Sequence, residues 1–146
     1  MAYNPVPSEL IFKTLEDAGF TESVVGREIV YERANHRLPT LVVRVFTSAK
    51  VGRDQVAERG KDAIRVVLVY RPEGGGQTKA VKKGKRVFRT GATEDILKRM
   101  MDRARELYTM ANWMSTVPAC KNCGAPCYRE SKRCAAYCYF KRKAAA

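Results

Sequence analysis

The sequence predicts an α+β domain in which an antiparallel sheet of about four strands is covered by two helices, with a C-terminal zinc-ribbon-like module. Amphipathic helical segments flank several segments rich in β-branched residues. The connections between those segments are short, which favours antiparallel pairing. All five cysteines lie after residue 119. We therefore expect an α+β domain over residues 1–117 and a cysteine module with a basic tail over residues 118–146.

The first expected element is a short helix over residues 8–18. Ser8 can cap its N-terminus, and Gly19 can end it. Apolar residues recur along one stripe of this helix, at Leu10, Ile11, Leu15 and Ala18. The stripe indicates a helix that packs on the core.

Strands are expected next, over residues 24–33, 40–48 and 63–71, with a short basic strand within residues 80–89. Gly26 fits a bulge in the first of them. In the second and third strands, alternate positions are wholly apolar and should meet the helices. The opposite face carries Arg44, Phe46, Arg65 and Arg71 among valines, which is typical of a half-open sheet surface.

The strongest helical pattern covers residues 93–114. Thr93 is the expected cap, and Glu94 and Asp95 suit the positive end of the helix dipole. The helix should end before Pro118.

Charge is the most informative global property. The chain has 28 basic and 15 acidic residues, and residues 1–60 are balanced, so the whole surplus of +13 lies after residue 60. This asymmetry indicates a polyanion-binding surface. Nucleic acid is the expected polyanion, with an anionic membrane or an acidic protein as alternatives, and charge does not separate DNA from RNA.

The cysteine cluster favours a metal site over disulfides, because the cysteines are crowded together and odd in number. Soft thiolates select Zn²⁺, with an iron–sulfur cluster as the competitor. The expected zinc ligands are Cys120, Cys123, Cys134 and Cys138. Cys127 is the expected spare, although it could replace Cys134 or Cys138.

The stretch CKNCGAPCYRESKRCAAYCYF resembles the zinc-ribbon modules of nucleic-acid enzymes, including the C-terminal ribbons of type IA topoisomerases. The shared features are a C-x-x-C-G knuckle, a basic hairpin and a second cysteine pair near an aromatic residue. The C-x-x-x-C second pair and the extra cysteine depart from that pattern. The resemblance covers only this module, and it implies a structural zinc ion and contact with single strands.

Three groups of residues are candidate nucleic-acid contacts. A basic arm after the glycine-rich turn should bind phosphates, although lysines there could instead protect a sheet edge. The half-open sheet face could combine charge with base stacking on Phe46, or could be a protein interface. The arm candidates are Lys79, Lys82, Lys83, Lys85, Arg86 and Arg89; the tail candidates are Arg129, Lys132, Arg133, Lys141 and Arg142; the sheet candidates are Arg44, Phe46, Arg65 and Arg71.

No catalytic motif is recognisable. His36 is the only histidine, and no phosphate-binding glycine loop is present. Acidic residues that could hold nuclease metals do not have a diagnostic spacing; they are Glu28, Glu32, Asp54, Glu58 and Asp62. We expect a non-catalytic protein that binds DNA or RNA. The alternatives are an accessory protein docking on an acidic surface of a nucleic-acid-processing complex, and a metal-dependent nuclease.

No membrane-spanning helix is expected, because no apolar run approaches the roughly 18–20 residues that such a helix needs. Nucleic acid, rather than a membrane, is the expected partner. The segment MAYNPVPSEL also lacks the basic and apolar regions of a secretory signal. We expect a cytoplasmic protein in a reducing compartment.

Overall fold

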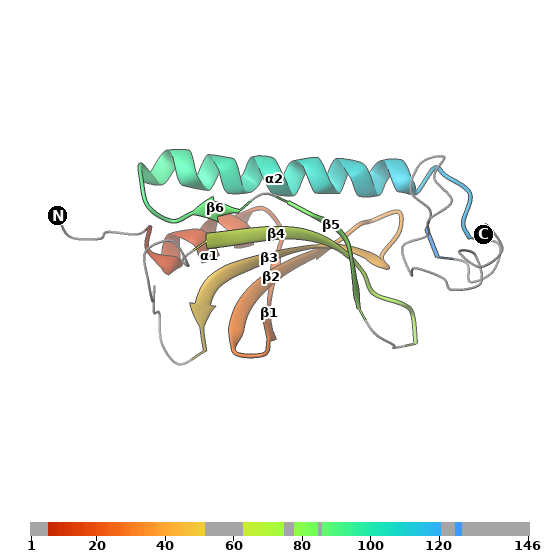
Figure 1. Cartoon of the computed structure of the whole chain (residues 1–146), viewed down its shortest axis with the longest axis horizontal. Coiled ribbons are helices and arrows are strands. Elements are labelled where there is room, and N and C mark those ends of the chain that lie inside the picture. Colours follow the sequence, from red (N-terminus) through yellow and green to blue (C-terminus); the bar gives the residue numbers. More distant parts are fainter. Residues whose placement is uncertain (1–5, 52–62, 75–77, 85, 121–124, 127–146) are drawn as a thin grey trace, which may run out of the picture.

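A computed structural model describes residues 6–51, 63–74, 78–84, 86–120 and 125–126. One antiparallel sheet forms a layer, and the long helix α2 runs along it (Figure 1). The elements, in chain order, are α1 (Ser8–Asp17), β1 (Thr21–Val25), β2 (Glu28–Ala34), β3 (Leu41–Lys50), β4 (Ala63–Tyr70), β5 (Lys79–Lys83), β6 (Val87–Phe88) and α2 (Thr93–Met114). The predicted α+β class and the two helices are confirmed.

The strands follow the order β1-β2-β3-β4-β5, and every neighbouring pair is antiparallel. The short strand β6 also pairs with β4, at Ala63 and Ile64, beyond the part of β4 that pairs with β5. Together, β5 and β6 form one interrupted edge of the sheet.

The sheet has six strands instead of the expected four. The strand expected within residues 80–89 is divided into β5 and β6. The segment predicted as a single bulged strand is a hairpin. Val25 pairs with Glu28, so Gly26 and Arg27 make a two-residue turn. Gly26 has a φ of +64°, in the left-handed region that glycine adopts at little cost. Glycine is compatible with both a bulge and a turn, so its position in the sequence does not distinguish a bulged strand from a hairpin.

Both helices pack on one face of the sheet. The buried residues of α2 are spaced three or four apart, at Ile96, Met100, Ala104, Leu107, Ala111 and Met114. They join Ile11 and Leu15 of α1 in a single core with alternate residues of β3 and β4. The apolar face predicted for these two strands is therefore confirmed.

The predicted helix caps are wrong. Pro7 and Ala92 occupy the N-cap positions, and neither helix has a side-chain cap. Ser8 is buried, and its hydroxyl accepts a hydrogen bond from Arg89 instead (2.9 Å). Ser8 therefore connects α1 to the segment after β6.

The start of the cysteine module belongs to the domain core. Cys120 is 4 % exposed and Ala125 is 1 % exposed, and both are part of the main apolar cluster. The backbone N–H of Cys120 donates to the carbonyl oxygen of Ala125 (2.8 Å). The predicted boundary at residue 118 therefore does not separate these two residues from the core. Residues 121–124 and 127–146 of the module lie outside the described residues.

In the residues that the structure describes, no helix combines the length and the apolar character needed to cross a membrane.

Candidate nucleic-acid interface

The predicted charged face of the sheet lies opposite the helices. Phe46 of β3 is directly across from Arg65 of β4, and Arg44 is across from Val67. Directly opposed residues of an antiparallel pair point to the same side, so these side chains share one face. Arg71 follows β4 and is anchored there, because its N–H donates to the carbonyl oxygen of Thr40 (2.7 Å).

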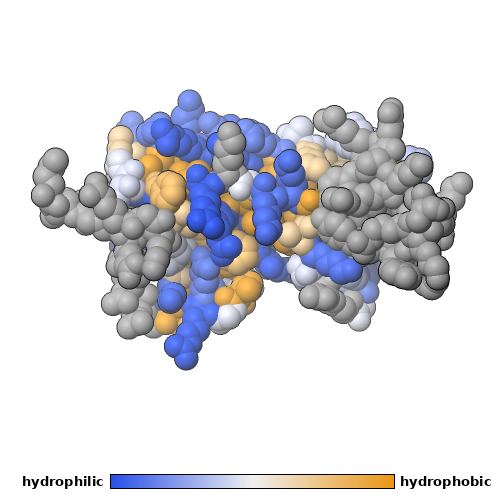
Figure 2. Space-filling model, viewed as in Figure 1, coloured by the Kyte–Doolittle hydropathy of each residue, from blue (hydrophilic) through white to orange (hydrophobic). Residues whose placement is uncertain are grey.

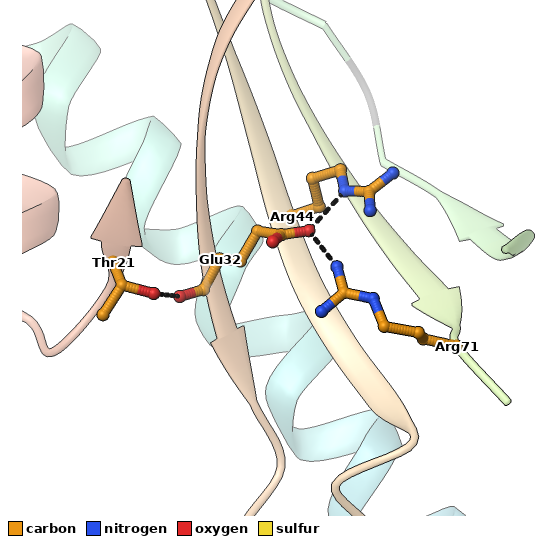
Figure 3. Close-up of polar contacts among 4 residues, drawn as sticks. All are labelled: Thr21, Glu32, Arg44 and Arg71. Atoms are coloured by element: carbon orange, nitrogen blue, oxygen red, sulfur yellow. Dashed lines mark hydrogen bonds and ion pairs between the residues drawn. The ribbon is translucent and has the colours of Figure 1, made fainter. Parts of the chain in front are cut away.

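Two of these arginines are bound to one carboxylate. Figure 3 shows Glu32 of β2 between Arg44 and Arg71, with both guanidinium groups directed at it. Oε2 of Glu32 lies 2.7 Å from Nε of Arg44 and 2.5 Å from Nη2 of Arg71. The Arg44 and Glu32 side chains are each only 12 % exposed, whereas Arg71 is 44 % exposed. Arg44 therefore has little freedom to contact a phosphate, and Arg71 retains an exposed side.

A second carboxylate occupies the other end of this face. Nη2 of Arg65 lies 3.5 Å from Oε1 of Glu28, and the other oxygen of Glu28 accepts the N–H of Ser48 (2.9 Å). Ser48 is a non-glycine residue with a φ of +68°, at an irregularity in the pairing of β2 with β3. The contact with Glu28 helps to hold this strained conformation.

The ring of Phe46 is covered by arginine. The guanidinium carbon of Arg65 lies 4.4 Å from the ring centroid, and that of Arg44 lies 6.0 Å away, both within the range of a cation–π contact. Phe46 also packs on a small apolar cluster of Val42, Val67 and Val69. A base could stack on this ring only if Arg65 moved away, so Phe46 fits a packing role better than a stacking role.

Glu28 and Glu32 are residues whose roles the sequence did not reveal. The alternation of β2 placed both on one face, but the register that brings them against Arg44, Arg65 and Arg71 depends on long-range pairing.

The basic segment after the glycine-rich turn is an edge strand in the described structure. Lys79, Lys82 and Lys83 belong to β5, which pairs with β4, and Arg86 comes just before β6. Lys82, Lys83 and Arg86 are exposed, and none forms an ion pair with any described residue. Hydrophilic side chains gather over β5 and β6 in Figure 2, with hydrophobic surface between them. Lys85 lies outside the described residues.

Gly84 sets the close approach of this segment to β4. Its N–H donates to the carbonyl oxygen of Val66 (2.8 Å), and a Cβ at this position would lie 2.6 Å from that same oxygen. Only glycine fits without a backbone shift. Gly84 thus holds Lys83, the residue before it, against β4.

Arg89 requires a correction to the predicted set. It was expected to contact phosphate, but it is 0 % exposed. Its guanidinium donates to the carbonyl oxygens of Val6 and Thr47 and to the hydroxyls of Ser8 and Ser48. These bonds join the segment before α1, β3 and the chain after β6. Arg89 therefore holds the fold together and is not part of the surface.

The charges on α2 balance each other. The helix carries four basic and four acidic residues. Three ion pairs follow the helical spacing: Arg99 with Asp95 (3.0 Å), Arg103 with Glu106 (3.6 Å) and Arg105 with Asp102 (3.3 Å). The outer surface of α2 therefore contributes nothing to the basic surplus.

His36 lies in the exposed loop between β2 and β3. Nδ1 of its ring is 3.0 Å from the hydroxyl oxygen of Tyr108, and Asn35 bonds to Asn112 (2.8 Å). These contacts fasten the loop to α2 and indicate a structural role.

The remaining predicted site residues lie outside the described residues. They are the metal candidates Cys123, Cys134 and Cys138 and the tail candidates Arg129, Lys132, Arg133, Lys141 and Arg142. Within the described part of the chain, no three histidine, cysteine, aspartate or glutamate side chains are grouped so that they could hold a metal ion.

Comparisons of the chain with protein-family models, curated proteins and solved structures found no match.

Proposed function

We propose that this protein binds nucleic acid through a basic edge, defined here as Lys82, Lys83 and Arg86 on and beside β5. The observation that supports the proposal most is that these three cations are exposed and form no ion pair within the described residues. No acidic residue lies between Glu73 and Glu94. The arginines of the sheet face and of α2 are, by contrast, held by carboxylates.

The basic edge would bind chiefly through the phosphate backbone. Lysine and arginine side chains neutralise phosphates and release the counterions condensed around them, which makes binding strongly dependent on salt. Such contacts orient the polymer but do not read its sequence. A paired strand fixes the spacing of these cations better than a free loop would, so less conformational entropy is lost on binding.

We also propose that the C-terminal cysteines hold one structural zinc ion. Four thiolates form a closed tetrahedral site with no open position for a substrate, so the metal would stabilise the tail without catalysis. The hydrogen bond from Cys120 to Ala125 supports this, because it brings Cys120 close to the residue that follows the C-x-x-C-G sequence. The ribbon would add the tail cations to the same binding function.

A protein partner is the second candidate, and a separate observation favours it. Apolar side chains are exposed near the turn that joins β1 to β2: Val24 is 49 % exposed, Val25 is 38 % exposed, and Val51 is 56 % exposed. Val51 belongs to the same region, because its N–H donates to the carbonyl oxygen of Arg27 (2.8 Å). Exposed apolar residues therefore gather near this turn, at the edge of the sheet opposite to β5.

The test is to replace Lys82, Lys83 and Arg86 with alanine and to measure binding to a labelled oligonucleotide at several salt concentrations. Each lost phosphate contact should make the negative slope of log affinity against log salt shallower by about 0.7 on a single strand. The slope of the triple variant should therefore be shallower by about 2. The matched control replaces three other exposed cations, Lys13, Arg37 and Lys98, which lie on α1, the β2–β3 loop and α2.

The control variant should keep nearly the whole slope of the unmodified protein, although it carries the same net charge as the test variant. Equal losses in the two variants would show that overall charge, not the basic edge, drives binding. An unmodified protein that binds no oligonucleotide at low salt would refute the proposal.

A further inference from the structure

We infer that Phe88 stacks on a base and that the ligand of the basic edge is single-stranded nucleic acid. This inference rests on the proposed function, since it names the kind of polymer that the same surface binds. The stacking ring is then Phe88 and not Phe46, the ring that the sequence suggested.

The register of the sheet places Phe88 beside the basic edge. Phe88 pairs with Ala63, and Lys83 pairs with Val67, so both flank the same side of β4 and point to the same face. The two pairs are four positions apart on β4, a distance of about 13 Å along the strand. Arg65 lies between them on that face, two residues from Ala63 and two from Val67.

The ring of Phe88 is unusually open to water. It is 46 % exposed, whereas its neighbour Val87 is 3 % exposed and packs in the core. In the described part of the chain, no other ring or guanidinium stacks on it. Phe46, on the same face, is covered by Arg65. Of the two rings described on this face, Phe88 is therefore the one on which no arginine stacks.

Exposed aromatic residues next to cations are typical of surfaces that bind single strands. Each base has a π-face, so stacking on a ring tolerates any sequence, while the cations follow the backbone. In a duplex the bases already stack on each other, and a ring can reach them only after they are unstacked at a cost of a few kcal/mol. Phe88 shares its face with Lys83, and Lys82 and Arg86 lie along the same edge of the sheet. This combination of a ring with cations therefore favours a single strand.

The experiment compares Phe88→Ala, Phe88→Leu and Phe88→Trp in binding to a labelled single strand and to a duplex of equal length. Stacking on one base is worth about 1–3 kcal/mol, so Phe88→Ala should weaken single-strand binding about tenfold with the salt slope unchanged. Phe88→Leu keeps an apolar side chain but no ring, so its affinity for the single strand should fall nearly as much. Phe88→Trp keeps a ring and should bind the single strand as well as the unmodified protein does. Leu10→Ala, which removes a 42 %-exposed apolar side chain on α1, is the control and should change nothing.

A second measurement does not depend on a variant. An oligonucleotide carrying 5-iodouracil forms a photochemical crosslink to a stacked ring, and trypsin would release the modified site as the peptide Val87–Arg89. A crosslink there supports the inference; a crosslink confined to other peptides overturns it.

The outcomes separate this inference from the proposed function. If the unmodified protein binds single strands with a steep salt slope, and Phe88→Ala binds them equally well, the inference fails while the proposed function stands. Equal weakening of duplex and single-strand binding by Phe88→Ala would also overturn it, because stacking on a free base would not be the cause. Absence of any oligonucleotide binding refutes both.

Discussion

Arginine side chains occupy three different environments in this protein. Arg89 is fully buried and donates to four different residues. Arg44 and Arg71 share one carboxylate oxygen of Glu32 on the sheet face. Arg86, three residues before Arg89, is exposed and forms no ion pair with a described residue. Net charge predicts none of these differences, because each depends on which residues surround the arginine side chain in the folded protein.

Replacing Arg89 with alanine should destabilise the fold, and replacing Arg86 should not. Loss of Arg89 leaves buried acceptors on Val6, Ser8 and Thr47 without that donor, which should lower the free energy of unfolding by about 3 kcal/mol or more. Arg86→Ala changes an exposed site and should stay within about 0.5 kcal/mol. Chemical denaturation of both variants measures the difference. A stable Arg89→Ala protein that binds oligonucleotides poorly would support the surface role that the sequence suggested.

At the scale of single elements, the helices were easier to predict than the edges of the sheet. The long helix has the predicted bounds, since its apolar residues recur locally with the helical period. The basic segment was expected to contain one short strand within residues 80–89, yet it forms two strands, β5 and β6, and both pair with β4. That pairing depends on Gly84 reaching Val66 and on Val81 and Val87 entering the core, and these contacts are made with residues distant in the sequence.

The hydroxyl of Tyr31 connects the helix α1 to the β1–β2 hairpin. Tyr31 of β2 is 1 % exposed, and its hydroxyl lies 2.9 Å from Oε1 of Glu16 on α1 and 3.3 Å from Oε1 of Glu22 on β1. Its ring also packs against Phe12, with 5.4 Å between the centroids. Burial, and then hydrogen bonding to the carboxylates of Glu16 and Glu22, raise the pKa of Tyr31 well above its usual value.

This raised pKa predicts a loss of stability in alkali. The stabilisation by the Tyr31 hydroxyl is fully present below the unfolded-state pKa of about 10, and it decreases as the pH rises above that value, by up to about 1.4 kcal/mol per pH unit. At neutral pH, Tyr31→Phe should lower the free energy of unfolding by about 1 kcal/mol, because the hydrogen bonds are lost.

Unfolding of the two proteins measured from pH 7 to pH 11 tests this expectation. Lysine deprotonation affects both proteins alike, so it cancels in their difference. The deficit of Tyr31→Phe should shrink, and then reverse, above about pH 10. A constant difference up to pH 11 would contradict the proposed cause.

At the scale of the whole molecule, the fold separates surfaces of different charge. The charges of α2 are paired along the helix, the arginines of the sheet face are neutralised by Glu28 and Glu32, and the β5 edge remains basic. The sequence contains the surplus charge, and its strand pattern predicted the charged face of the sheet correctly. It could not predict this local neutralisation, because Glu28 and Glu32 are far in sequence from Arg65 and Arg71, and only strand pairing brings them together.

The cysteine module should affect the stability of the whole domain, because two of its residues, Cys120 and Ala125, lie in the core. Cys120 and Ala125 share the apolar cluster that also contains Met114 at the end of α2. A zinc ion that fixes the turn after Cys120 would therefore also fix this part of the core, and metal binding would contribute to the folding free energy.

Elemental analysis of the purified protein should find about one zinc per chain, as four thiolates form a single tetrahedral site. Removal of zinc with a chelator should lower the melting temperature of the domain and weaken oligonucleotide binding through loss of the ordered tail cations. Cys120→Ser should release the metal, whereas Cys127→Ser, the matched control, should retain it. Loss of zinc from Cys127→Ser would show that Cys127 is a ligand. A metal-free protein, or one with iron–sulfur absorbance, would refute the zinc site. A melting temperature unchanged by zinc removal would show that the module is independent of the core.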